Sequence, residues 1–212
     1  YGQWNWEVTT TRTRAAAGDA PLTAAGSVTI AAPVAWGQYE VLIAAKHQSF
    51  LDIIMIYSAV PRPKFIMKKE LLWAPIVGWY AKRIGCVAVD RGKRGQAIAK
   101  MVEDVKAGRA EPGRLIIYPQ GTGVAAGATK AYKVGTGILY VETGHTCVPA
   151  ATNVGVFWPR HGILRKPGLA VVEFLPPIPA GMPQADFMAQ IEAVIEGASD
   201  RLMAEAGFTE KG

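Results

Sequence analysis

The chain has 212 residues, a formal net charge of +6 and half of its residues apolar. This length suits one domain with a substantial core, and the apolar content excludes a disordered chain. The positive charge favours an anionic partner, such as a phosphorylated ligand or an anionic membrane surface. The basic residues lie in no aromatic-rich motif of the RNA-binding type, so we do not expect a nucleic-acid partner.

Residues 1–38 show no clear periodicity and are interpreted as an N-terminal segment. Because the chain begins at Tyr1, a membrane anchor upstream is compatible with it, although no run in the sequence approaches the roughly 18 apolar residues of a spanning helix. Cys86 and Cys147 lie in separate apolar runs and are expected to be free, buried thiols.

From Val41 onward, short apolar runs alternate with segments of helical character. Strands are predicted over 41–46, 64–67, 86–89, 114–118, 146–152 and 169–174, and helices over 52–60, 75–83, 95–107, 132–142 and 183–206. The alternation predicts a single α/β domain over residues 39–212, with a largely parallel central sheet flanked by helices. In such sheets, ligands bind at the carboxyl ends of the strands.

His47 and Asp52 follow the first of these strands and begin the first helix. In a regular helix, five residues turn the chain by about 500°, so the two side chains would point apart. At a strand-to-helix turn, the carboxylate can instead fold back onto the imidazole and make it a better general base. The alternative is a histidine beside a helix cap, formed by Ser49 or Asp52, with no chemistry.

A basic turn over 90–94 follows the strand at 86–89. Arg91, Gly92, Lys93 and Arg94 combine three cations with a glycine near the start of a helix, which is typical of a phosphate-binding turn. A solvated turn of charges is the alternative.

A glycine turn, Tyr118-Pro119-Gln120-Gly121-Thr122-Gly123, follows the strand at 114–118. Backbone N–H groups, the Thr122 hydroxyl and the Gln120 amide could face an anionic oxygen here. The spacing of Gly121, Gly123 and Gly127 also resembles a dinucleotide-binding fingerprint. Pro119 interrupts that pattern, and Glu142 falls at a helix end rather than a strand end, which weighs against NAD(P).

Val148 and Pro149 lie in an apolar strand that could wall an acyl or ligand channel, or could simply form core. His145 and His161 have no ligand spacing with each other or with Cys147, so no metal site is predicted.

Taken in order, these four segments resemble the sequence blocks of the 1-acylglycerol-3-phosphate acyltransferases, a family of glycerolipid acyltransferases. The family blocks are H-x-x-x-x-D (His47 to Asp52), a Gly-adjacent Arg after a strand (Arg91), an aromatic-Pro-Glu-Gly-Thr-Arg string (from Tyr118) and an apolar Val-Pro strand (Val148-Pro149). Their order across residues 41–160 carries the resemblance.

The resemblance implies an enzyme that moves an acyl group from acyl-CoA or acyl-carrier protein to the free hydroxyl of lysophosphatidic acid, giving phosphatidic acid. His47 would act as the base and Asp52 would orient it. Arg91, with Lys93 or Arg94, would hold the phosphate, and the turn with Gln120, Gly121 and Thr122 would complete the cradle or stabilise the oxyanion. No cofactor is implied. The expected location is the cytoplasmic face of a bacterial inner membrane.

Two positions depart from the family pattern. Gln120 replaces the usual Glu, which removes a charge, and Gly123 replaces an Arg whose planar fork glycine cannot supply. Lys130 and Lys133 are candidates to replace it. The acceptor could therefore be another lysophospholipid, a lyso-aminolipid or glycerol-3-phosphate. A non-catalytic membrane-binding module and an NAD(P)-dependent oxidoreductase are the alternatives from other classes.

Overall fold

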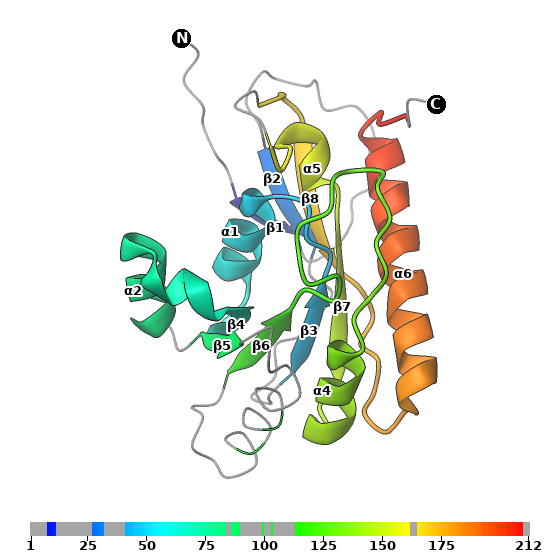
Figure 1. Ribbon diagram of the computed structural model, residues 1–212. Coiled ribbons are helices and arrows are strands. Elements are labelled where there is room, and N and C mark those ends of the chain that lie inside the picture. The colour runs from blue at the N-terminus through cyan, green and yellow to red at the C-terminus, as the bar shows by residue number, and fades with distance from the viewer. Residues whose placement is uncertain are drawn as a thin grey trace.

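The computed structural model describes residues 8–11, 27–31, 41–83, 86–89, 113–161 and 165–209, with single helical positions at 99 and 103. Within them, a twisted sheet has helices on both faces (Figure 1). The strands are β1 (Val8–Thr11), β2 (Ser27–Ala31), β3 (Leu42–Ala45), β4 (Pro63–Lys68), β5 (Val87–Val89), β6 (Arg114–Ile117), β7 (Cys147–Thr152) and β8 (Leu169–Phe174). The helices are α1 (Phe50–Ala59), the 3-10 helix η1 (Lys69–Trp73), α2 (Pro75–Arg83), α4 (Gly135–Thr143), α5 (Val154–Phe157) and α6 (Gln184–Glu205).

The eight described strands form one sheet in the order β1-β2-β8-β7-β3-β6-β4-β5. Among the pairs in this sheet, only β7 and β8 run antiparallel. This confirms the predicted α/β domain with a largely parallel sheet flanked by helices. The central strand β3 lies between β6 and β7, so that Ile43 pairs with Ile116 on one side and with Val148 on the other.

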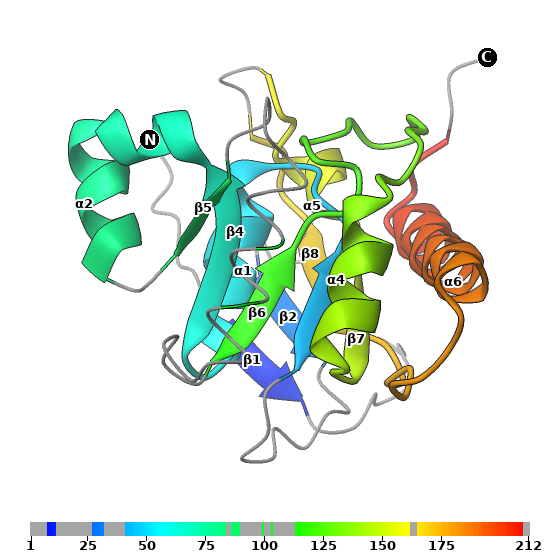
Figure 2. The ribbon, with the colours of Figure 1, turned by 60° about the horizontal axis from the view of Figure 1, so that its bottom comes forward.

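The alternating side chains of β3 enter two different core clusters. Ile43 and Ala45 pack with α1, whereas Leu42 and Ala44 pack with α4 and α6. A buried strand with helices on both faces is apolar at every position, as the sequence of β3 is. Figures 1 and 2 show α1 on one face and α4 with α6 on the other.

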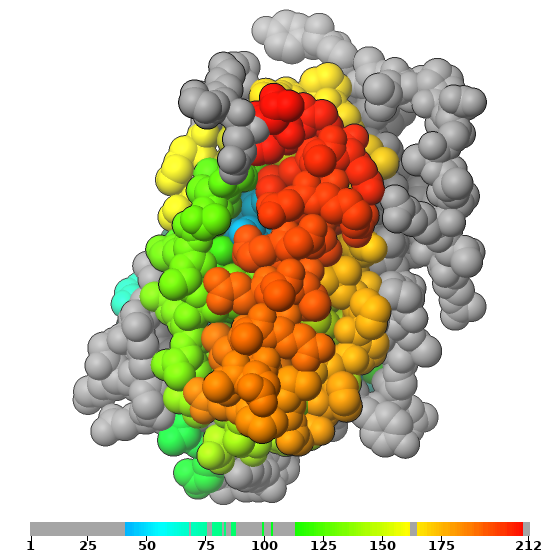
Figure 3. Space-filling view, turned by 90° about the vertical axis from the view of Figure 1, so that its right-hand side faces the viewer, coloured from blue at the N-terminus to red at the C-terminus, as the bar shows by residue number. Residues whose placement is uncertain are grey.

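Helix α6 covers most of its side of the molecule. Figure 3 shows α6, in orange and red, running the length of this face, with the green part of the chain that begins at residue 113 along one side of it. Its buried residues recur at helical spacing, as in Phe187, Ile191 and Ile195, and they stack against α4 and the sheet.

Apart from the helix over 95–107, the predicted elements from residue 41 onward are present, with the same bounds for α2 and β8 and ends shifted by one to three residues elsewhere. The predicted helix over 95–107 lies outside the described residues, except for 99 and 103, which are helical. Strands β1 and β2 were not predicted. They join the sheet through parallel pairing of β2 with β8.

Two sequence expectations concern the cysteines and membrane-spanning helices. Cys86 and Cys147 are free thiols, Cys147 buried and Cys86 only half-buried. Burial raises the pKa of Cys147 to about 12. In the described part of the chain, no helix has the length and apolarity needed to cross a bilayer.

Candidate active site

Two of the four sequence blocks, and the end of the strand that holds a third, meet at the same end of the sheet because their strands are parallel neighbours. His47 follows the end of β3, the turn over 118–124 follows β6, and the segment from Asn153 follows β7. The carboxyl ends of neighbouring parallel strands lie at the same end of the sheet. The order β7-β3-β6 therefore places the His47 loop between the 118–124 turn and the segment from Asn153.

Asp52 both caps α1 and orients His47. Ser49 is the N-cap and accepts a hydrogen bond from the Leu51 backbone, while one oxygen of Asp52 accepts from the backbone N–H of Gln48 (2.7 Å) and of Ser49 (2.8 Å). This reciprocal arrangement is a capping box with Asp at the third helical position. The other oxygen lies 2.8 Å from His47 Nδ1. One carboxylate therefore both caps α1 and holds the imidazole, which is the geometry that the catalytic interpretation requires.

The hydrogen bond to Asp52 defines the tautomer of His47. A carboxylate only accepts hydrogen bonds, so Nδ1 carries the proton and Nε2 keeps its lone pair. Asp52 is fully buried, whereas His47 keeps a fifth of its side chain exposed. The imidazole can therefore take a proton from a molecule that approaches from outside, and Asp52 would stabilise the imidazolium that forms.

Tyr118 supports the imidazole from the side of β6. The two ring centroids lie 4.5 Å apart with a tilt of 31°. Burial, and next the negative charge of Asp52, raise the pKa of the Tyr118 hydroxyl well above its usual value. In the described part of the chain, this hydroxyl has no hydrogen-bond partner.

The 118–124 turn is fixed to the His47 loop through its backbone. Gly121 has a φ of +68°, which favours glycine, and its N–H bonds to the Tyr118 carbonyl at 2.8 Å. A Cβ at Gly121 would also lie only 2.6 Å from Lys133 Cε. At the end of the turn, the Val124 N–H donates to the His47 carbonyl at 2.8 Å. The turn is therefore bonded directly to the backbone of the residue that carries the base.

The buried face of the turn is joined to α6 by a charged network. Gln120 Nε2 donates to Glu196 at 3.3 Å and to the Lys130 carbonyl at 3.4 Å, and the Tyr132 hydroxyl donates to Glu196 at 2.8 Å. The buried Lys46 ammonium forms an ion pair with the same carboxylate. The Gln120 amide thus points to α6 in this structure, on the side away from solvent.

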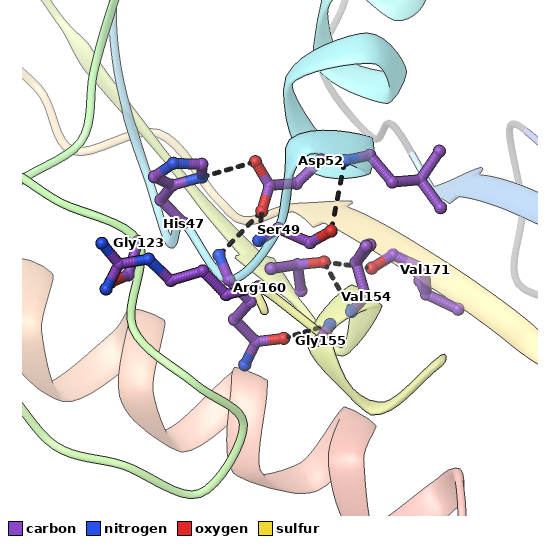
Figure 4. A network of polar contacts seen from close by, with 11 residues as sticks. His47, Ser49, Asp52, Gly123, Val154, Gly155, Arg160 and Val171 are labelled. Carbon is purple, nitrogen blue, oxygen red and sulfur yellow. Dashed lines mark hydrogen bonds and ion pairs between the residues drawn. The ribbon is translucent and has the colours of Figure 1, made fainter. Parts of the chain in front are cut away.

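The exposed face of the turn receives an arginine from the segment after α5. Arg160 Nη1 donates to the Gly123 carbonyl at 2.8 Å, and Nη2 donates to Thr122 Oγ1 at 3.3 Å. A Cβ built on Gly123 would lie 3.3 Å from Arg160 Cδ and 3.4 Å from His47 Cδ2. Arg160 and His47 are therefore neighbours, separated by little more than the space that Gly123 leaves open (Figure 4).

The position of the Arg160 segment is set by buried hydrogen bonds to the His47 loop. Gln48 is fully buried, and its Oε1 accepts from the Gly155 N–H at 2.9 Å. Thr152 accepts from the Val154 N–H at 3.1 Å and donates to the Val171 carbonyl. Figure 4 shows this chain of bonds running from the capped end of α1 to α5, which leads to Arg160.

The remaining predicted site residues lie in different environments. Arg91, Gly92, Lys93 and Arg94 lie outside the described residues, although β5 ends just before them and is parallel to β4. Val148 and Pro149 are buried in β7, with Val148 in the core against α1. Their role as channel walls stays a prediction.

The glycine turn lacks the helix that a dinucleotide-binding fingerprint needs. Residues 123–133 are irregular, and α4 begins only at Gly135. The pyrophosphate of a dinucleotide binds at a helix that opens directly after the glycines. This geometry disfavours the NAD(P) alternative. Among the described residues, no group of three or more His, Cys, Asp or Glu side chains could hold a metal ion.

Comparison with known proteins gives the family. The sequence profile described as "Acyltransferase" matches residues 27–153, more than half of the 212-residue chain. The chain belongs to this acyltransferase family. The matched region contains His47, Asp52 and the 118–124 turn, and it ends before Arg160.

Individual relatives have more specific names. The chain is 26% identical over 164 residues to a 1-acyl-sn-glycerol-3-phosphate acyltransferase of Pseudomonas aeruginosa, covering 77% of this chain and 64% of the relative. It is 29% identical over 140 residues to the human 1-acyl-sn-glycerol-3-phosphate acyltransferase alpha, covering 65% of this chain and 50% of the relative. The chain thus spans between half and about two thirds of these two proteins.

A solved structure shares the fold. The crystal structure of a 1-acyl-sn-glycerophosphate acyltransferase from Thermotoga maritima superposes with a TM-score of 0.71 at 21% identity, covering 84% of this chain and 73% of the other.

Sequence reasoning missed two residues that bond to the turn, the candidate ligand Arg160 and the structural carboxylate Glu196. Arg160 follows the last block and belongs to no motif, and Glu196 lies on the amphipathic helix α6, 76 residues after Gln120. The only sequence signal for either was indirect. The departure from the family pattern at Gly123 indicated that another cation was needed at the turn, for which Lys130 and Lys133 were the candidates.

Proposed function

We propose that the protein transfers a fatty acyl group from an acyl thioester to the free hydroxyl of lysophosphatidic acid, giving phosphatidic acid. The observation that carries this proposal is the His47 Nδ1–Asp52 contact of 2.8 Å, within the segment that matches the acyltransferase profile. The names of the relatives from Pseudomonas aeruginosa and human support this choice of acceptor.

The reaction needs no acyl-enzyme intermediate. His47 Nε2 takes the proton of the acceptor hydroxyl while the hydroxyl oxygen attacks the thioester carbonyl. The resulting oxyanion collapses, the C–S bond breaks, and the thiolate leaves with the proton from the imidazolium. Asp52 holds the imidazole in orientation throughout and stabilises its charged form. The donor is acyl-CoA or acyl-carrier protein, and no cofactor takes part. The basic 90–94 segment remains a proposed phosphate ligand.

An acyl-transfer assay with acyl-CoA and lysophosphatidic acid tests the proposal. We expect His47→Ala to lower kcat/KM by about 10²- to 10⁴-fold, the usual contribution of a general base. His145→Ala is the matched control. His145 precedes β7, whereas His47 follows the parallel strand β3, so the two histidines lie at opposite ends of the strands. An active His47→Ala variant would overturn the mechanism, and no turnover by the wild type with any acyl donor would overturn the function.

We also propose that the protein works at an anionic membrane, with the cytoplasmic leaflet of a bacterial inner membrane as the expected site. The support is an aromatic patch on η1 and α2, formed by Leu71, Trp73, Trp79 and Tyr80, all of which are exposed. Trp73 alone leaves 84% of its surface in solvent. Aromatic side chains of this kind favour the depth of the lipid headgroups.

The surroundings of the aromatic patch suit a lipid surface. Figures 1 and 2 show α2 projecting beyond β5, the last strand in the order of the sheet. The Arg83 guanidinium lies 5.3 Å from the Trp79 ring, which places a cation among the aromatic groups.

On α1, Phe50, Ile54 and Tyr57 form a second exposed apolar face at helical spacing, beginning beside Asp52. Lipid acceptors would thus have apolar surface next to the base.

Co-sedimentation with vesicles tests this location. Vesicles of phosphatidylglycerol and phosphatidylcholine should retain the wild type and lose most of a Trp73→Ser/Trp79→Ser variant. Val141→Ser removes an exposed apolar side chain from α4, far along the chain from the patch, and should bind as the wild type does. Equal binding of all three proteins would contradict the role of the patch.

A further inference from the structure

We propose that Arg160 binds the phosphate of the acceptor in place of the arginine that is absent at position 123. This inference rests on the proposed function and assigns part of its substrate site. Arg160 lies outside the region matched by the family profile, on the segment that follows α5.

The first argument is the way in which the guanidinium is held. Two of its five N–H groups are used by Gly123 O and Thr122 Oγ1. Within the described part of the chain, no carboxylate neutralises it. Arg160 is exposed, so the remaining donors can reach a molecule outside the protein. A cation held in one orientation with unused donors is suited to a phosphate monoester, which accepts several bonds from a planar fork.

The second argument is the distance from the base. A single methyl group at Gly123 would contact both Arg160 and His47. In lysophosphatidic acid the free hydroxyl and the phosphate are on adjacent carbons of glycerol, so the base and the phosphate ligand must also be close. The phosphates of coenzyme A are separated from the thioester by the whole pantetheine arm. The cation beside His47 therefore matches the acceptor rather than the donor.

The third argument is the space at position 123. An arginine at this position would start from a Cβ that lies 3.3 and 3.4 Å from Arg160 Cδ and Nε. Such contacts are tight, so the two side chains compete for the same space. Glycine at 123 is what allows Arg160 to reach the turn. An arginine at position 123 and the arginine at position 160 would thus place a guanidinium group in the same space.

Steady-state kinetics with a charge swap test this assignment. The wild type is first measured with lysophosphatidic acid, and a protein without turnover would contradict the proposed function rather than this inference. In an active protein, Arg160→Ala should raise KM for lysophosphatidic acid by about 10- to 100-fold, the usual effect of losing a charged hydrogen bond, with a smaller change in kcat. The Gly123→Arg/Arg160→Ala variant should recover most of this loss, because the new side chain fills the vacated space.

Matched controls distinguish two roles for Arg160, binding the substrate phosphate and stabilising the 118–124 turn. Lys166→Ala removes the same charge from another exposed position after α5 and should leave KM unchanged. With monoacylglycerol, which lacks the phosphate, Arg160→Ala should match the wild type. Equal losses with both acceptors, or no recovery in the double variant, would show that Arg160 only braces the turn. A raised KM for acyl-CoA, but not for a phosphate-free N-acetylcysteamine thioester, would assign Arg160 to the donor. Any of these three results would overturn the proposal.

Discussion

The two faces of the 118–124 turn both receive a charged side chain from outside the four sequence blocks, and they differ in what that charge can do. On the buried face, Glu196 is bonded to Lys46, Gln120 and Tyr132. On the exposed face, the Arg160 guanidinium bonds to the turn through only two of its donors. A charge whose partners are all protein groups stabilises the fold, whereas a charge with unused donors can bind a ligand.

The same comparison explains the two departures from the family pattern. Gln120 donates its amide to a carboxylate that α6 already supplies, so a Glu at this position would place two carboxylates together. Gly123 leaves open the space through which Arg160 reaches the turn. Each departure therefore has a partner that is distant in sequence.

The largest effect is expected on the buried face. Glu196→Ala would leave the Lys46 ammonium, which is only 2% exposed, without its partner. We expect a loss of about 3 kcal/mol in the free energy of unfolding, near the lower end for a buried pair because Glu196 is itself 24% exposed. Urea denaturation measures this. Glu192→Ala, at an exposed position one turn earlier in α6, is the control and should change stability by less than about 0.5 kcal/mol. Similar values for both variants would contradict a stabilising role for the network.

Restoring the family residue on the same face should also destabilise the protein. Gln120→Glu puts a second carboxylate beside Glu196, and the repulsion would raise the pKa of the introduced carboxyl above its unfolded value of about 4.3. The folded state then binds more protons than the unfolded state, so the penalty grows as pH rises from about 4 and reaches roughly 1–3 kcal/mol near pH 7. Denaturation at several pH values measures it. The Gln120→Glu/Glu196→Gln variant removes the repulsion, so the growth of the penalty between pH 4 and pH 7 should disappear, although Lys46 also loses its carboxylate partner. A penalty that still grows with pH in the double variant would contradict the repulsion.

An intermediate effect is expected where the exposed face is positioned. Gln48→Ala removes the acceptor of the buried Gly155 N–H, which should cost about 1–3 kcal/mol of stability. Because α5 leads to Arg160, the same change should raise KM for lysophosphatidic acid. Gln190→Ala, at an exposed position on α6, is the control for both measurements. Normal kinetics in a destabilised Gln48→Ala protein would show that Arg160 is positioned by other contacts.

The strands and helices from residue 41 onward could be predicted because each has its own signal in the sequence. Strand β3 is a short apolar run that is buried on both faces, and α1 begins at a capping Ser-x-x-Asp. Strands β1 and β2 have no such apolar run. The sequence of β1 is Val-Thr-Thr-Thr, and β2 joins the sheet through its pairing with β8, 138 or more residues away. Tertiary pairing, rather than local sequence, places them.

The candidate site could be predicted only where its residues lie close in sequence. His47 and Asp52 are five residues apart, so the capping geometry brings them together. Arg160 contacts the turn from 37 residues away, whereas Lys130 and Lys133, which are closer in sequence, were the predicted cations. In the structure, Lys133 packs its side chain against Gly121, and Lys130 offers its carbonyl to Gln120. Which cation reaches Gly123 depends on where α5 directs the chain after β7.

The smallest effect is expected at Tyr118, the first residue of the turn. Its ring supports His47, but its buried hydroxyl has no partner among the described residues. Burial raises the pKa of this hydroxyl, so it stays neutral at any working pH and can supply no negative charge to the base. Tyr118→Phe keeps the ring and removes an unsatisfied polar group. We expect kcat/KM within about twofold of the wild type and an unfolding free energy equal or up to about 1 kcal/mol higher. Tyr118→Leu, which also removes the ring, should lower kcat. A large loss of rate in the Phe variant would instead give the hydroxyl a part in proton transfer, and the turn would then contribute to the chemistry as well as to binding.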